Sequence, residues 1–262
     1  MPMLDHTESA RTLAKRAAHK KQAIKAGSQP PKPTPWPYEV EQSGWFKSHE
    51  AIRADLRDTL AVIARMRTAK ALEDWEVPTL RRWWAHFDAF IREHHHLEED
   101  RLFPLVATRA ELPLRLADDH AELERLLVVA EAALGACTEQ AGLPYVEAAV
   151  RAVSDHMLPH LREEEADVMP ALHAKFGHGE FSKFEGKFAA ADFQWFSLPH
   201  LYRPMPAADR RPHALHVFGI PAPVYDYLLA RNMARFDKGP GADIQRLLGE
   251  HGQEEAAMGR CM

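Results

Sequence analysis

The chain of 262 residues has little cysteine, with only Cys137 and Cys261. Two cysteines give neither a disulfide framework nor a Cys-x-x-Cys motif, so we do not expect a disulfide-stabilised secreted fold or thiolate sites for zinc or iron–sulfur clusters. The chain also has no long uncharged apolar run, and its first residues lack the apolar core of a signal peptide. We therefore expect a cytoplasmic protein with no membrane-spanning segment.

Acidic residues outnumber basic ones outside the first 35 residues. The chain has a net charge of −5, yet residues 1–35 carry an excess of Lys and Arg, so the remainder is strongly acidic. A net acidic body argues against nucleic acid as a partner. The prolines between Pro30 and Pro37 remove backbone donors and favour an extended chain. We predict that residues 1–43 form a flexible basic arm and linker.

Histidine, in contrast, is abundant, and the 16 histidines include a repeated pattern. One copy reads His-x-x-x-Glu at His94 and Glu98, and the second copy reads the same at His160 and Glu164. Both copies continue with a second Glu and end at a proline. Residues four apart share one helical face, so each copy places an imidazole and a carboxylate side by side.

Apolar residues recur at three- and four-residue steps in four segments, which predict helices over 46–67, 78–103, 114–135 and 144–174. The short connections favour an all-α fold with an up-down-up-down four-helix bundle over 44–175. We expect Pro159, inside the last segment, to kink that helix. His49 and His120 lie on the apolar stripes of the first and third helices. The order His, His-x-x-x-Glu therefore occurs twice, which indicates a duplicated two-helix unit.

Six ionisable side chains occupy stripe positions where a bundle normally buries apolar residues. They are His49, His94, Glu98, His120, His160 and Glu164. Buried carboxylates and imidazoles are costly unless they are paired, and two divalent cations would compensate them. Nitrogen and oxygen donors without thiolate suit iron or manganese. We expect a dinuclear site in which the two glutamates bridge the ions.

This arrangement resembles the hemerythrin-like (HHE cation-binding) family, whose bacterial members carry the same motif order on a four-helix bundle around a non-haem di-iron centre. The resemblance covers residues 44–175. It implies that the six residues above bind two iron ions, with manganese less favoured, and that a small molecule such as dioxygen binds at an open position.

The sequence departs from the oxygen-carrying members, which have a His-x-x-x-His pair on the third helix. Here the corresponding residues are His120 and Glu124, so Glu124 is a candidate seventh ligand, with a solvated or outer-sphere acid as the alternative. Its counterpart Arg53 cannot bind a metal. His156 is a further candidate, for which an outer-sphere role or core packing is favoured. Five neighbours lie off the stripe, and we expect them to face solvent: His95, His96, Glu99, Asp100 and Glu165.

The metal pattern stops after residue 175. Aromatic residues from Phe176 to Phe196 predict an amphipathic helix, and a proline-rich segment precedes a further helix over 224–236. This extension, 176–262, could cover the cofactor, form a homodimer contact or dock a partner. A surface metal site formed by His200, His213 and His216 is a less favoured reading.

The function expected from these residues is the binding or sensing of a small oxidant, either dioxygen, peroxide or nitric oxide, at an open iron position. One alternative is a redox enzyme that removes peroxide or nitric oxide at the same centre. Another is iron sensing or storage, in which the buried His and Glu layer couples folding to metal supply. The chain has no Ser-His-Asp arrangement or phosphate loop that would indicate a hydrolase.

Overall fold

The computed structural model describes residues 33, 35–113, 115–181 and 197–258, and all the regular secondary structure in these residues is helical. Most of the predicted basic arm and residues 182–196 of the predicted aromatic helix lie outside the described residues. None of the described helices combines the length and apolar character that crossing a bilayer requires. The all-α class expected from the sequence is confirmed for the described part of the chain.

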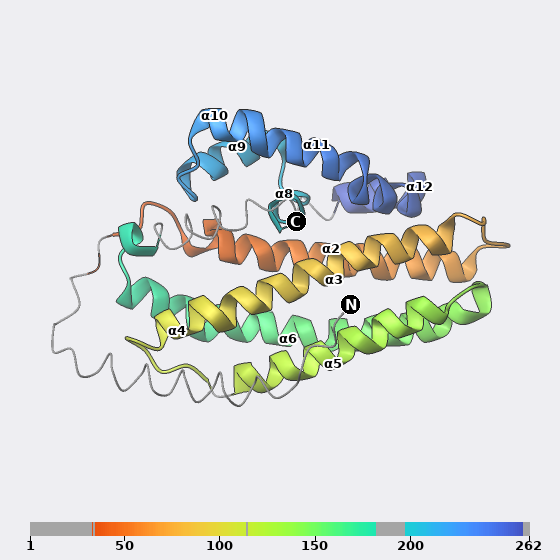
Figure 1. Cartoon of the computed structure of the whole chain (residues 1–262), viewed down its shortest axis with the longest axis horizontal. Coiled ribbons are helices and arrows are strands. Elements are labelled where there is room, and N and C mark those ends of the chain that lie inside the picture. The colour runs from red at the N-terminus through yellow and green to blue at the C-terminus, as the bar shows by residue number, and fades with distance from the viewer. Residues whose placement is uncertain (1–32, 34, 114, 182–196, 259–262) are drawn as a thin grey trace, which may run out of the picture.

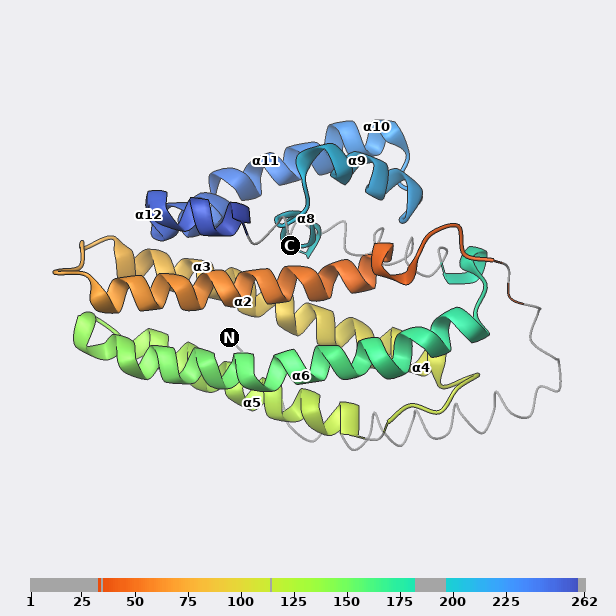
Figure 2. The ribbon, with the colours of Figure 1, turned by 180° about the vertical axis from the view of Figure 1, so that it is seen from behind.

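Four long helices lie side by side along the long axis of the molecule (Figures 1 and 2). They are α2 (Gly44–Thr68), α3 (Glu76–Leu97), α5 (Arg115–Ala136) and α6 (Leu143–Lys175). Helix α2 contacts α3 and α6, while α5 contacts α3 and α6. Each helix therefore has two neighbours, and their apolar stripes together form a continuous core. The bounds of α2, α5 and α6 agree with the predicted segments to within two residues, whereas the second segment, predicted over 78–103, is α-helical only to Leu97 and continues as a π-helical turn.

The two prolines that follow the repeated motifs are accommodated differently. After α3 the chain forms a π-helical turn, η2 (Glu98–Leu102), and then α4 (Phe103–Val106). Pro104 cannot donate a hydrogen bond to the preceding turn, and the wider turn is closed instead by the Phe103 N–H donating to the Glu98 carbonyl. In the second repeat, α6 continues through both Pro159 and Pro170.

The C-terminal part of the chain packs along the outer face of α2 and α3 (Figure 1). It comprises α8 (Ser197–Tyr202), α9 (Ala207–His216), α10 (Ala222–Val224), the π-helical η4 (Tyr225–Leu229), α11 (Ala230–Lys238) and α12 (Pro240–Met258). Short 3-10 turns, η1 (Val40–Gln42) and η3 (Gln140–Gly142), precede α2 and α6. Ile244 and Leu247 of α12 are fully buried within the same core as the bundle helices. The extension therefore completes the apolar core.

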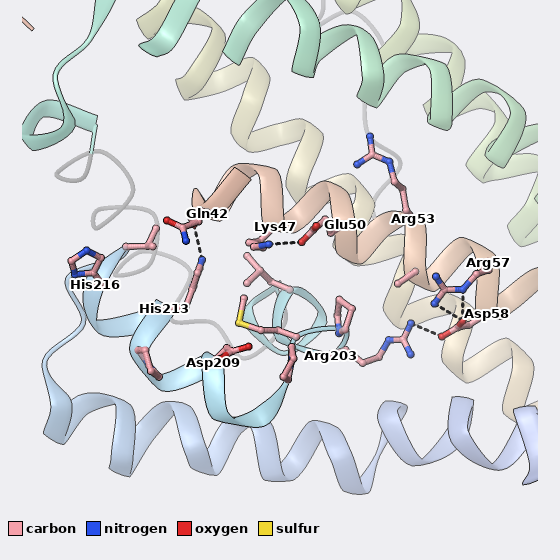
Figure 3. Close-up of a pocket in the computed structure, with 17 residues that line it drawn as sticks. Gln42, Lys47, Glu50, Arg53, Arg57, Asp58, Arg203, Asp209, His213 and His216 are labelled. Atoms are coloured by element: carbon pink, nitrogen blue, oxygen red, sulfur yellow. Dashed lines mark hydrogen bonds and ion pairs between the residues drawn. The ribbon is translucent and has the colours of Figure 1, made fainter. Parts of the chain in front are cut away.

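A buried ionic cluster fixes α8 to α2. His200 Nδ1 lies 2.6 Å from Asp55 Oδ2, and both side chains are fully buried. Arg203 pairs with Asp55 at 2.5 Å and with Asp58 at 2.7 Å. A groove of about 740 Å³ remains between α2 and α8–α9, lined by Asp58, Arg203 and His213 among others (Figure 3). His200 is thus a buried partner of Asp55, so the surface metal site considered for it is wrong.

Candidate metal centre

The six predicted stripe residues converge inside the bundle from all four long helices. Helix α2 supplies His49, α3 and η2 supply His94 and Glu98, α5 supplies His120, and α6 supplies His160 and Glu164. All six are buried, with exposed fractions of 5% or less. Their ligand atoms form two groups that share the two glutamates, and within each group the atoms lie within 4.8 Å of one another.

Each glutamate presents its two oxygens to different histidines. Glu98 Oε1 lies 3.1 Å from His94 Nε2, whereas its Oε2 lies 3.5 Å from His120 Nε2. Glu164 Oε2 lies 3.4 Å from His49 Nε2, whereas its Oε1 lies 3.4 Å from His160 Nε2. Donors at right angles around an ion with bonds of about 2.1 Å are about 3 Å apart. The spacing therefore suits metal binding, and the six side chains would hold two cations between them.

The cluster has more buried polar atoms than the chain itself can pair. Among the atoms without a hydrogen-bond partner are Nε2 of His49 and His94, Oε2 of Glu98, and both carboxylate oxygens of Glu164. An unpaired buried polar group costs roughly 1–3 kcal/mol, and more when it is charged. Because these atoms face a common centre, bound cations would satisfy them together. The residues present therefore fit a dinuclear metal site.

The electrostatics of the metal-free cluster are consistent with cation binding. Burial lowers the pKa of His94 to about 4 and that of His160 to about 3, so both imidazoles stay neutral and keep a lone pair for a metal. Burial opposes ionisation of Glu98, but the neighbouring His94, His49 and His120 together lower its pKa. Burial, followed by the charge of Glu98, raises the pKa of Glu164 well above its usual value. The raised pKa of Glu164 favours its protonated form, and a bound cation would compete with that proton.

The second Glu of each repeat orients a histidine of the other half. Glu165 Oε1 lies 3.0 Å from Nδ1 of His49 and 2.8 Å from Arg53. In the matching contact, Glu99 Oε1 lies 3.1 Å from Nδ1 of His120. A carboxylate on Nδ1 fixes the ring and leaves Nε2 as the metal-binding nitrogen. We expected both glutamates to be solvated; the Glu165 side chain is only 19% exposed, whereas that of Glu99 is 36% exposed and so is partly solvated. The contacts of both with histidine were missed, although their recurrence in register was a usable signal.

Trp45 and Ser48, at the start of α2, provide two further contacts that the sequence did not reveal. The Trp45 indole N–H donates to Glu98 Oε1, the same oxygen that faces His94. Ser48 Oγ lies 3.2 Å from Nδ1 of His94. Both residues lie within one helical turn of His49, so the start of α2 positions ligands on two helices.

Glu124 does not join the cluster. Its carboxylate is exposed on α5 and pairs with Arg92, so the structure gives no support to its prediction as a seventh ligand. His156 is half-buried, and its Nε2 lies 3.5 Å from Asp119. It also lies outside both shared groups. The position of Glu124 therefore agrees better with the alternative considered for it, a solvated acid.

His95 differs most from its expected position. We predicted that it faces solvent, but it is only 7% exposed and stacks on His120 with ring centroids 4.3 Å apart. Its neighbour His96 is exposed, as predicted, and also pairs with Asp100. A step of about 100° along a helix separates His95 from His94. The His95 side chain therefore does not share the helix face of His94. It points toward α5, where it contacts His120, and not toward solvent.

Residues 43–172 match the family model of the hemerythrin HHE cation binding domain. The matched segment contains the four long helices up to the last turn of α6 and all six clustered residues. No curated protein and no solved structure gives a significant match to the chain.

Proposed function

We propose, from the premise that the bundle of this chain belongs to the hemerythrin HHE cation-binding domain family, that the protein is a non-haem di-iron protein that binds or senses a small oxidant. The ligands are His49, His94, Glu98, His120, His160 and Glu164. Dioxygen, peroxide and nitric oxide are the candidate oxidants, and manganese is the less favoured metal. The helices would follow the up-down-up-down order expected of a four-helix bundle.

One observation carries this proposal: two buried carboxylates, each facing histidines of both halves through separate oxygens. Two iron ions would supply redox chemistry and open coordination positions for a small ligand. Six protein ligands leave such positions free, because two six-coordinate ions need more donors than these residues provide.

The chain's own residues control access and ligand geometry. Glu165 and Glu99 hold the His49 and His120 rings, and the Trp45 indole holds Glu98. Phe103 lies against His120, with ring centroids 5.7 Å apart and nearly parallel planes. Apolar rings beside the site exclude bulk water, and a dry site favours a small uncharged oxidant over hydrated anions.

The test is anaerobic loading with ferrous iron, followed by iron analysis and absorption spectroscopy during separate additions of dioxygen, peroxide and nitric oxide. We expect two irons per chain and a stable new absorption band with at least one of the three. Catalytic consumption of peroxide or nitric oxide without a lasting band would instead support a redox enzyme. Failure to bind iron would contradict the proposal.

Iron sensing is a second candidate, favoured by the unpaired buried donors of the cluster. If folding is coupled to metal binding, iron raises the melting temperature strongly while no oxidant produces a lasting band or turnover. Such a result would favour sensing or storage over oxidant binding.

The proposal places the protein in a reducing cytoplasm, where the buried Cys137 would remain the free thiol seen here. Exposed apolar side chains on η4, Tyr227 and Leu228, are candidates for a homodimer contact through the extension. Sedimentation of the purified protein, compared with a Tyr227→Ser variant, would test that contact.

A further inference from the structure

Asp119 on α5 faces two histidines of α6, the helix that packs beside it (Figure 2). Its Oδ1 lies 3.5 Å from His156 Nε2, and its Oδ2 lies 3.7 Å from His160 Nδ1. These separations exceed those of ordinary hydrogen bonds, and both nitrogens are buried without a hydrogen-bond partner. Two imidazoles therefore present unpaired nitrogens to one carboxylate, and imidazole nitrogen and carboxylate oxygen are donors that suit iron.

These three side chains lead from the surface to the buried centre. The exposed fraction of the side chain is 32% for His156, 25% for Asp119 and 1% for His160. The second nitrogen of His160, Nε2, lies 3.4 Å from Glu164 Oε1 within the centre. The His160 ring therefore lies between a partly exposed His–Asp pair and the other metal ligands, with one nitrogen on each side.

Asp119 differs in its partners from the other acids around the centre. Glu165 is paired with Arg53 at 2.8 Å, and Glu99 lies within hydrogen-bond distance of His120 Nδ1, at 3.1 Å. Among the described residues, Asp119 has no Lys or Arg partner. A positive side chain repels an approaching cation, whereas a carboxylate without a cationic partner attracts it. The side of the bundle with Asp119 is therefore the more favourable approach for a divalent ion.

We propose that Asp119 and His156 form an entry site for ferrous iron, from which the ion passes His160 into the buried centre. The inference rests on the proposed function, because it requires the centre to load iron. The six ligands are 5% exposed or less, so an aqueous ion must shed water before it reaches them. Two donors begin that exchange but hold the ion weakly, since groups of three close donors occur, among the described residues, only in and beside the centre. Weak binding lets the ion move on.

An entry site differs measurably from an acid that only orients His160. Loss of an orienting acid lowers the equilibrium affinity of the centre for metal. Loss of an entry site slows loading and release by the same factor and leaves the affinity unchanged, because the site lies on the path and not at its end. His156 decides between the two roles, since it faces Asp119 but lies outside both ligand groups.

The experiment is anaerobic stopped-flow loading of the full-length protein with ferrous iron, followed by release to a chromophoric chelator. In His156→Gln we expect loading to be at least ~10-fold slower than in wild type, release to be slowed equally, and two irons still to bind per chain. His96→Gln is the matched control, because His96 is an exposed histidine that also pairs with an aspartate, Asp100. It should load at the wild-type rate.

The charge of Asp119 gives a second test that begins with the wild-type protein. Added salt should slow wild-type loading, and Asp119→Asn should load slowly with a weaker dependence on salt. A wild-type loading rate that does not respond to salt would overturn the inference. So would a wild-type rate in His156→Gln, or a loss of affinity there in place of a loss of rate, although the proposed function would stand. If wild type binds no iron, the proposed function fails as well.

Discussion

Glu98 and Glu164 occupy equivalent places in the two repeats but differ in the metal-free protein. Three surrounding histidines favour the ionised form of Glu98, whereas burial and the charge of Glu98 favour the protonated form of Glu164. A neutral acid and an amide have nearly the same shape and similar hydrogen-bonding capacity. The role of Glu164 in metal binding can therefore be separated from its role in packing.

For Glu164→Gln we expect the metal-free stability to change by less than about 1 kcal/mol, because the amide replaces a protonated acid. Iron affinity should fall by at least ~100-fold, because an amide is a poor substitute for a bridging carboxylate. Glu163→Gln is the matched control, since Glu163 is the adjacent acid and pairs with Arg115 outside the cluster. Chemical denaturation and iron titration measure the two effects. Parallel losses of stability and affinity would assign Glu164 a structural role only.

The histidine pKa values predict a pH dependence for the metal-free protein. Burial holds the pKa values of His94 and His160 at about 4 and about 3, against 6.5 in the unfolded chain. Burial also holds the pKa of His95 well below 6.5, while burial and the charge of Glu98 raise the pKa of Glu164, which acts in the opposite direction. The three histidines outnumber the one carboxyl and are protonated in the unfolded chain at a higher pH than in the folded chain, so we expect stability to fall as the pH decreases below 6.5.

Each proton by which the two states differ contributes about 1.4 kcal/mol per pH unit to the slope of stability against pH. Urea denaturation of metal-free protein at several pH values measures it. His94→Gln should lower the slope by about one proton. Stability that is constant or rises as the pH falls from 6.5 to 4.5 would contradict these assignments.

Much of the site could be predicted at this scale because the ligands recur at helical spacing. Each His-x-x-x-Glu pair lies on an otherwise apolar stripe, which marks it as buried and in need of a partner. The contacts of His95, Glu99 and Glu165 were missed because we assumed that only residues on the apolar stripe of a helix are buried. Their contacts depend on which neighbouring helix lies beside each face, and one sequence does not specify this.

At the scale of elements, the four long helices were predictable because each stripe runs for several turns without a break. The π-helical turn after α3 was not, since Pro104 predicts only that the regular pattern stops. Proline alone does not decide the outcome, because α6 continues through Pro170 at the equivalent place. The contact between α2 and α8 could not be predicted from the sequence either, because it joins residues about 145 positions apart.

Asp55 on α2 should be the residue on which the docking of α8 depends most. In Asp55→Ala, Arg203 and His200 lose a buried counter-ion, so we expect a loss of roughly 3–5 kcal/mol in the free energy of unfolding. Asp243→Ala removes an ion pair whose partner Arg82 is largely exposed, and should cost less than about 1 kcal/mol. Urea denaturation of both variants makes the comparison. Similar small losses in the two would show that the buried cluster contributes little.

At the scale of the whole molecule, the extension and the bundle share one apolar core, while the metal cluster lies in the layer between the four long helices. The extension therefore supports α2 and α3 from outside, and those two helices carry His49, His94 and the turn with Glu98. Its contribution to the core was not predictable, because short helices in a proline-rich segment have weak periodicity.

The central claim is that the buried histidines and glutamates are held together by two cations. The most direct measurement is elemental analysis of the full-length protein after anaerobic loading with ferrous iron and removal of excess metal, together with its melting temperature. We predict two irons per chain and a markedly higher melting temperature than that of the metal-free protein. Fewer than one iron per chain, with an unchanged melting temperature, would contradict the claim.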